Sequence, residues 1–221
     1  MNIRKKRMIL SCIVVLLLTS LACTSLDGLF PNTKVNDSPD PIKFSDDFSQ
    51  DNSGWEIGEF DGGGIGYNRG KYFVSSIGSG SIMWGGAGRS FEDVSIEVSA
   101  EQVSAPANNN NDYGVICRLQ RDGGGYYGLV SGDGFFAILR ESEGDNFAVL
   151  VDWTASSHIR QGNSQNQLGL SCVGSKISFF VNGQLLAETS DSMYDSGDIG
   201  LTATSYEPEG TEIQFDNVVV K

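Results

Sequence analysis

The sequence has one histidine, four cysteines and five prolines. No CxxC pair or comparable ligand spacing accompanies His158, so a cysteine–histidine metal site is not expected. No GK[ST] follows the glycine clusters and no G-x-S-x-G elbow is present, which argues against phosphate-loop enzymes and serine hydrolases of the α/β type. The glycine runs near Asp61 and Arg121 are instead expected to be turns or bulges.

Positive charge is also scarce. The chain has 15 basic and 28 acidic side chains, a formal net charge of −13, and without the four basic residues of its first segment the charge is −17. A surface this acidic repels phosphate backbones, so nucleic acid is not an expected partner. Direct adsorption to anionic lipid is disfavoured for the same reason, whereas cations and neutral glycans remain compatible ligands.

No apolar run reaches the roughly 20 residues of a membrane-spanning helix. The longest, from Met8 to Ala22, follows four basic residues and predicts a signal peptide over residues 1–22. Leu21-Ala22-Cys23 resembles the bacterial lipoprotein box. The resemblance implies that Cys23 is acylated, for example with palmitate, and anchors an extracytoplasmic protein to the membrane of the cell envelope. An ordinary secretory signal or an uncleaved anchor is the alternative.

The residues after the box predict a spacer followed by one domain. Residues 23–42 contain three of the five prolines together with polar residues, which is typical of a disordered tether. Residues 43–221 have the length of a single all-β domain.

Short alternating runs dominate this domain, and no helical period appears. In VSIEVSAEQ, apolar side chains from Ile96 onward alternate with polar ones, as on a half-buried strand. Asn182-Gly183 predicts a type I′ hairpin, Gly132-Asp133-Gly134 a turn, and Asp216-Asn217 a bulge in the last strand. A dozen or more such strands predict an all-β, two-sheet antiparallel sandwich.

Cys117 and Cys172 share strand faces with apolar residues and are expected to point into the core. A disulfide between them requires Cα atoms within about 7 Å, which neighbouring strands would provide. Two buried free thiols are the alternative.

Several segments together resemble a known group of domains: FSDDFSQDNSGW, YGVICRLQRDGGGYYGLVSGDGFFAI, NQLGLSCVGSKISFFVNGQLLAE and the closing FDNVVV. They resemble bacterial concanavalin A-like jelly-roll domains, including laminin-G-like and keto-sugar glycoside hydrolase-like members. The similarity runs from about Phe44 to Lys221. It implies the jelly-roll fold, but this fold hosts lectins, glycosidases and adhesion modules, so it does not decide activity.

Catalytic residues are not evident. Laminarinase-type members of this group carry paired acids close to E-x-D-x-E on one strand, so that one carboxylate can donate a proton while another attacks carbon. Here Glu97 and Glu101 share a face but are separated by Ser99, and they are expected to face solvent. His158 is expected to be a surface residue. The sequence favours a binding module over an enzyme and leaves both open.

Candidate ligand-binding residues are Trp84 and Tyr127, aromatic side chains near glycines that are expected to be exposed. Trp55 and Trp153 are expected to pack. A structural Ca²⁺ site would be formed by Asp46, Asp47 and Asp216 if the first and last strands pair; turn and bulge chemistry is the alternative.

The hypothesis is a lipid-anchored module that binds glycan or another envelope component without catalysis. A glycoside-processing enzyme of the keto-sugar hydrolase kind and a structural or protein-interaction module are the alternatives.

Overall fold

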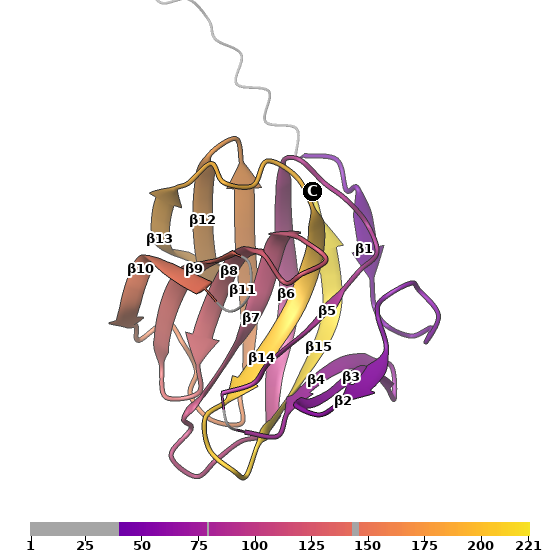
Figure 1. Cartoon of the computed structure of the whole chain (residues 1–221), viewed down its shortest axis with the longest axis vertical. Helices are drawn as coiled ribbons and strands as arrows, with labels where there is room; N and C mark the ends of the chain where they lie inside the picture. Colours follow the sequence, from indigo (N-terminus) through magenta and orange to yellow (C-terminus); the bar gives the residue numbers. More distant parts are fainter. Residues whose placement is uncertain (1–39, 79, 143–145) are drawn as a thin grey trace, which may run out of the picture. The chain divides into compact units, whose positions relative to one another are not determined.

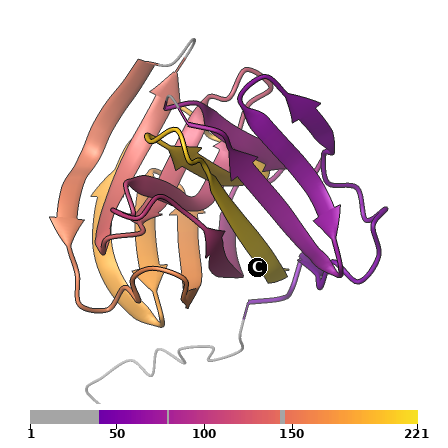
Figure 2. The same ribbon diagram turned by 90° about the horizontal axis from the view of Figure 1, so that it is seen from below.

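Fifteen strands build the part of the chain that the computed structural model describes, residues 40–78, 80–142 and 146–221. In these residues we find no helix long and apolar enough to cross a membrane. The strands form two antiparallel sheets packed face to face (Figures 1 and 2), so the predicted all-β sandwich is confirmed.

The larger sheet has nine strands in the order β13-β12-β11-β6-β15-β4-β3-β2, with β1 also paired to β15. Its strands are β1 (Phe44–Asp46), β2 (Gly58–Phe60), β3 (Gly63–Asn68), β4 (Lys71–Ser76), β6 (Val94–Ser104), β11 (Gln165–Val173), β12 (Lys176–Val181), β13 (Gln184–Ser190) and β15 (Thr211–Val220).

The smaller sheet has six strands in the order β10-β9-β8-β7-β14-β5. Its strands are β5 (Ile82–Gly86), β7 (Asn111–Leu119), β8 (Gly125–Ser131), β9 (Phe135–Ser142), β10 (Asn146–Ala155) and β14 (Asp198–Ser205).

The main core lies between the two sheets because alternate side chains of each strand point inward. Ile96 and Val98 of β6 contribute from the larger sheet, and Tyr113 and Val115 of β7 contribute from the smaller one. All four are essentially inaccessible to solvent. Burying such a side chain stabilises the fold by roughly 1.5–3 kcal/mol.

The predicted turns and bulge are also present. Asn182 and Gly183 have φ angles of 51° and 79°, as the type I′ hairpin between β12 and β13 requires. In β15 the pairing with β6 shifts register between Asp216 and Val219, and Asn217 has a φ of 55°. The apolar residues before and after the bulge fall on opposite phases of the strand alternation. The register shift turns both sets of side chains toward the core.

One glycine run matches the prediction only in part, because Asp61 and Gly62 form a turn and the residues that follow do not. The GGIGYN segment is not a turn but strand β3, paired with β2 and β4. Position 63 requires glycine, because a Cβ atom there would collide with the Ser75 carbonyl oxygen. Close approach of two backbones therefore explains this glycine, where the sequence predicts a turn or bulge.

Residues Asp40–Lys221 form one compact unit, so its first residue lies close to the predicted domain start at residue 43. The expected signal peptide over residues 1–22, Cys23 and nearly all of the tether over residues 23–42 lie outside the described residues.

Candidate functional site

The face of the smaller sheet that points away from the larger sheet carries a second apolar cluster. Ile116, Tyr127 and Leu129 are buried there, and Trp84 and Leu139 pack against them at its margin. These residues come from β5, β7, β8 and β9, and they are separate from the core between the sheets. We call this surface the outer face.

A pocket of about 250 Å³ opens at one end of the outer face, and we call it the rim pocket. Its residues come from the loop before β7 and the start of that strand, from the hairpin formed by β8 and β9, from β10, and from the loop after β14. They are Asn109, Asn110, Asn111, Asp112, Ser131, Asp133, Phe135, Trp153 and Tyr206. The volume lies near the lower end of the usual range for small-ligand sites.

Three aromatic rings of the rim pocket are open to solvent. Trp153 is 37%, Phe135 39% and Tyr206 49% exposed. Trp153 lies on β10, an edge strand that has a neighbour on one side only. Phe135 begins β9, and its backbone N–H donates to Ser131 Oγ at 2.9 Å. Such rings offer an apolar surface on which a flat, partly apolar ligand can stack.

The pocket also has a buried carboxylate. Asp112 is only 3% exposed, and the Tyr206 hydroxyl donates to its Oδ2 at 2.7 Å. Burial raises the pKa of Asp112 to about 6, against the opposing effect of hydrogen bonds from Tyr206 and Thr204. Asp133, in the β8–β9 turn, is exposed and accepts a hydrogen bond from Ser131 Oγ.

Hydrogen bonds tie together two of the loops that form the pocket. Asn108 and Asn110 donate through their side chains to Glu207 Oε1 at 2.9 and 2.8 Å. The Tyr206 backbone N–H donates to the Asn110 carbonyl oxygen at 3.2 Å. The loop before β7 and the loop after β14 are therefore joined, so two walls of the pocket are held together by hydrogen bonds.

A narrower hollow of about 70 Å³ extends the rim pocket along the outer face. Asp112 and Tyr206 line both, and Thr202, Thr204 and Phe147 line the extension together with members of the apolar cluster. The lining of the second hollow is thus more apolar than that of the rim pocket.

Tyr127, predicted as an exposed ligand-binding residue, is buried at 1% exposure, so that expectation is wrong. Its hydroxyl lies 2.6 Å from the Gly123 carbonyl oxygen and 2.7 Å from Glu141 Oε2, and its ring packs edge-on against Phe147. Tyr127 lines only the narrow extension, where it serves as an inner wall.

Trp84 is half-buried and lines a different hollow, with Ile57, Phe60 and other apolar side chains beside the edge strand β5. Trp55 packs as predicted, and its Nε1–H donates to Asp46 Oδ2 at 3.1 Å. Trp153 does not pack as predicted, because edge strand β10 leaves its ring open. The position of Trp153 beside turn residues is the feature of the sequence that could have indicated an exposed ring.

The first and last strands do pair, with Asp46 opposite Val218, as the calcium hypothesis assumed. The carboxylate of Asp46, however, accepts hydrogen bonds from Phe48 N–H and Trp55 Nε1–H, and Asp47 accepts one from Ser49 N–H. In the described ranges, no three His, Cys, Asp or Glu side chains are grouped to hold a metal. Turn chemistry accounts for the hydrogen bonds of Asp46 and Asp47, and the expected site with Asp216 gains no support.

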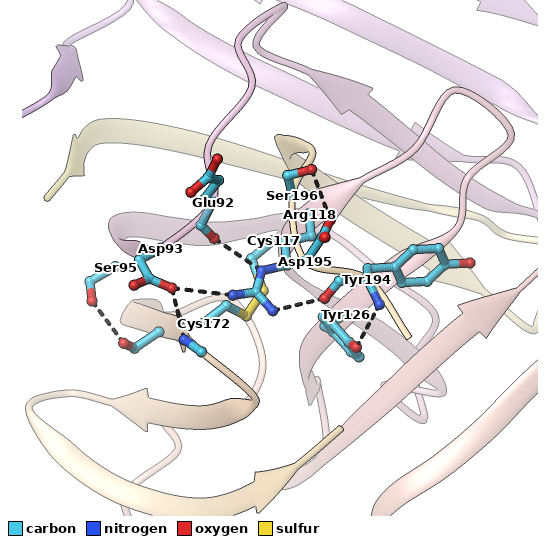
Figure 3. A network of polar contacts seen from close by, with 12 residues as sticks. Glu92, Asp93, Ser95, Cys117, Arg118, Tyr126, Cys172, Tyr194, Asp195 and Ser196 are labelled. Atoms are coloured by element: carbon cyan, nitrogen blue, oxygen red, sulfur yellow. Dashed lines mark hydrogen bonds and ion pairs between the residues drawn. A yellow bond between two sulfur atoms is a disulfide. The ribbon is translucent and has the colours of Figure 1, made fainter. Parts of the chain in front are cut away.

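Cys117 and Cys172 form a disulfide with a Cα–Cα distance of 6.6 Å. Their strands, β7 and β11, belong to opposite sheets, so the bridge crosses the core instead of joining neighbours within one sheet. Beside it lies the buried side chain of Arg118 (Figure 3), whose Nε and Nη1 donate to the carbonyl oxygens of Glu92 and Tyr194 at 3.0 and 2.8 Å. A hollow next to this network is lined mainly by serines and acids and has no exposed aromatic platform.

Glu97 and Glu101 lie on β6 of the larger sheet, away from the rim pocket. Glu97 pairs with Lys221 at 2.8 Å and Glu101 with Lys71 at 3.0 Å, so they are solvent-facing ion-pair partners as expected. His158 is exposed in the loop after β10.

The raised pKa of Asp112 makes the stability of the protein depend on pH. Its folded pKa of about 6 lies above the ordinary value of 3.8, so the folded protein holds this proton more tightly than the unfolded chain. The free energy of unfolding therefore loses up to about 3 kcal/mol from this group as pH rises from about 4 to above 6. We expect Asp112→Asn to match the wild type near pH 4 and to be more stable than it near pH 8, measured by urea denaturation. A pH-independent difference between the two proteins would contradict this assignment.

Comparison with known proteins gives the fold. No known protein-family model matches the chain, and no curated protein matches it in sequence. Among solved structures, the carbohydrate binding module CBM66 from Bacillus subtilis superimposes with a TM-score of 0.55 at 18% identity, covering 76% of this chain and 96% of that one.

Two further structures are similar to the same extent. The catalytic domain of an endo-1,3-beta-glucanase (laminarinase) from Thermotoga petrophila RKU-1 has a TM-score of 0.56 at 10% identity, over 81% of this chain and 96% of the other. A Bacillus subtilis protein of unknown function with a galectin-like fold has 0.56 at 13% identity, over 81% and 94%. The described domain thus has the two-sheet β-sandwich fold of these structures, which include both a carbohydrate binding module and a glucanase catalytic domain.

Proposed function

We propose that this protein is a lipid-anchored, extracytoplasmic module that binds carbohydrate in the rim pocket without catalysis. The observation that carries the proposal is the combination of exposed Trp153, Phe135 and Tyr206 with hydrogen-bonding side chains in one hollow. The apolar faces of sugar rings stack on aromatic rings, while carboxylates and amides accept hydrogen bonds from their hydroxyl groups.

The fold supports this proposal in a coarser way, since domains of this shape include a carbohydrate binding module. The acidic composition supports it as well, because sugars need no positive surface. The disulfide fits an oxidising compartment outside the cytoplasm.

The test is glycan-array screening of the purified full chain, followed by calorimetry on the best ligand. Trp153→Ala should weaken binding roughly 30-fold or more, because truncation of a central aromatic contact commonly costs about 2 kcal/mol. Trp84→Ala is the matched control, since Trp84 lines another hollow, and it should leave affinity within about twofold. Loss of binding in Trp84→Ala but not in Trp153→Ala would place the site in that other hollow. Absence of binding to every polysaccharide and peptidoglycan fragment on the array would contradict the proposed function.

The anchor is tested separately. Cys23 should incorporate an alkyne analogue of palmitate in cells, and the protein should fractionate with membranes. Cys23→Ser should abolish both signals, whereas Cys12→Ser, within the expected signal peptide, should keep them. Labelling that persists in Cys23→Ser would overturn the proposed anchor.

A glycoside-processing enzyme is the second candidate, and one observation favours it. Asp112 is a buried carboxyl group whose pKa is raised into the range of a general acid, and it lies in a pocket together with Asp133. The same ligands should therefore be incubated with the protein and assayed for new reducing ends. Product release that Asp112→Asn abolishes would favour the enzyme; intact ligand after prolonged incubation favours the binding module.

A further inference from the structure

The rim pocket has an unbalanced charge. Asp112 and Asp133 line it, and among its described lining residues there is no lysine, arginine or histidine. Its remaining polar side chains are amides and hydroxyls, and the Tyr206 hydroxyl already donates to Asp112. The pocket therefore offers acceptors and negative charge but no cation to a ligand.

Among the described residues, neither Asp112 nor Asp133 forms an ion pair with a cationic side chain. Five ion pairs occur among the described residues, and they use other acids: Glu101, Asp93, Asp191, Glu188 and Glu97. Buried carboxylates in proteins are generally paired, because an unpaired charge loses its hydration without compensation. Asp112 is buried, faces the pocket and lacks such a partner, so a cationic ligand group would supply what the fold omits.

The aromatic walls are suited to the same kind of group. An ammonium within about 6 Å of an aromatic face is attracted by the ring's negative potential, most strongly for tryptophan. Trp153, Phe135 and Tyr206 provide three such rings around the carboxylates. A sugar that carries an ammonium can use ring stacking, cation–π attraction and a charge-assisted hydrogen bond in one site.

We propose that the rim pocket selects saccharides bearing a free, protonated amino group, such as de-N-acetylated hexosamine units, over their N-acetylated and acidic counterparts. This inference rests on the proposed carbohydrate-binding function and narrows its ligand class. An acetyl group removes the positive charge, and a uronic or sialic acid adds a negative charge beside two aspartates.

The test compares two oligomers that differ only in acetylation, a glucosamine tetramer and an N-acetylglucosamine tetramer, by calorimetry near neutral pH with the full chain. We expect the amine form to bind at least about tenfold more tightly, the usual effect of a hydrogen bond to a charged group. Asp112→Asn and Asp133→Asn should each reduce that preference to about twofold, and Trp153→Ala should weaken the binding of both oligomers.

Asp195→Asn is the matched control, because it removes one exposed negative charge outside the rim pocket. It should leave the preference intact; an equal loss in Asp195→Asn and Asp133→Asn would show diffuse attraction to an acidic surface and overturn the inference. Equal, Trp153-dependent binding of both oligomers would overturn the amine selectivity while the carbohydrate-binding function stands. If neither oligomer binds but the glycan array identifies another ligand whose binding depends on Trp153, the amine selectivity is overturned and the carbohydrate-binding function stands.

Discussion

Removal of the Cys117–Cys172 disulfide is expected to lower the free energy of unfolding by about 4 kcal/mol. The bridge closes a loop between residues 55 positions apart, and the loss of chain entropy that it imposes on the unfolded state grows with this separation. For a domain of this size, the melting temperature should fall by roughly 8–16 °C. Both sulfur atoms are buried, so the effect reports on the interior and not on a surface contact.

Urea denaturation of the Cys117→Ala/Cys172→Ala double variant would measure this loss. The reduced wild type is the control, since it keeps both side chains and lacks only the covalent link. The free energies of unfolding of the two proteins should agree within about 1 kcal/mol. Any difference between them reports the cavity that the alanine side chains leave. A loss below about 1 kcal/mol in both would show that the two sheets hold together equally well without the bridge.

Replacement of Arg118 by methionine is expected to cost about 3–5 kcal/mol. The guanidinium is 2% exposed, and it donates to the carbonyl oxygens of Glu92 and Tyr194 and approaches Asp93 Oδ1 at 3.4 Å. Methionine removes the donor from both of these partly buried hydrogen bonds, and a carbonyl group left unsatisfied away from water costs about 1–3 kcal/mol. Arg118 lies at a register shift between β7 and β14 and has a φ of 54°, and methionine would have to adopt the same backbone conformation.

Two variants show which contacts matter. Asp93→Asn should cost less than about 1 kcal/mol, because its carboxylate is largely exposed. Lys176→Met breaks the exposed pair with Glu188 and should be similarly mild. If Asp93→Asn proves as damaging as Arg118→Met, the ion pair rather than the two carbonyl groups is the stabilising contact.

Local patterns in the sequence are sufficient for most of the fold. Asn182-Gly183 predicted its hairpin because both residues tolerate positive φ, and the change of apolar phase around Asp216-Asn217 predicted the bulge. The strand β3 could not be found in this way. Its glycines serve the close approach of neighbouring strands, a tertiary requirement that resembles a loop signal in the sequence.

The candidate site was harder to predict for a related reason. Strand β8 is buried on both faces, so Tyr126 and Tyr127 lie on opposite sides and are equally hidden. Alternation separates the two faces of a strand but does not reveal that a second apolar cluster covers the outer one. Trp153 is open only because β10 is the last strand of its sheet, and strand order is not written in any local pattern.

The placement of β15 gives the domain a direction. The first strand, β1, pairs with the last residues of β15, and the loop that precedes β15 lies at the other end of that strand (Figure 1). Tyr206 of this loop lines the rim pocket. Ten extended residues separate these ends by roughly 30 Å. The proposed amino-terminal anchor would therefore join the domain at the end opposite the rim pocket, and would leave the pocket's opening unobstructed.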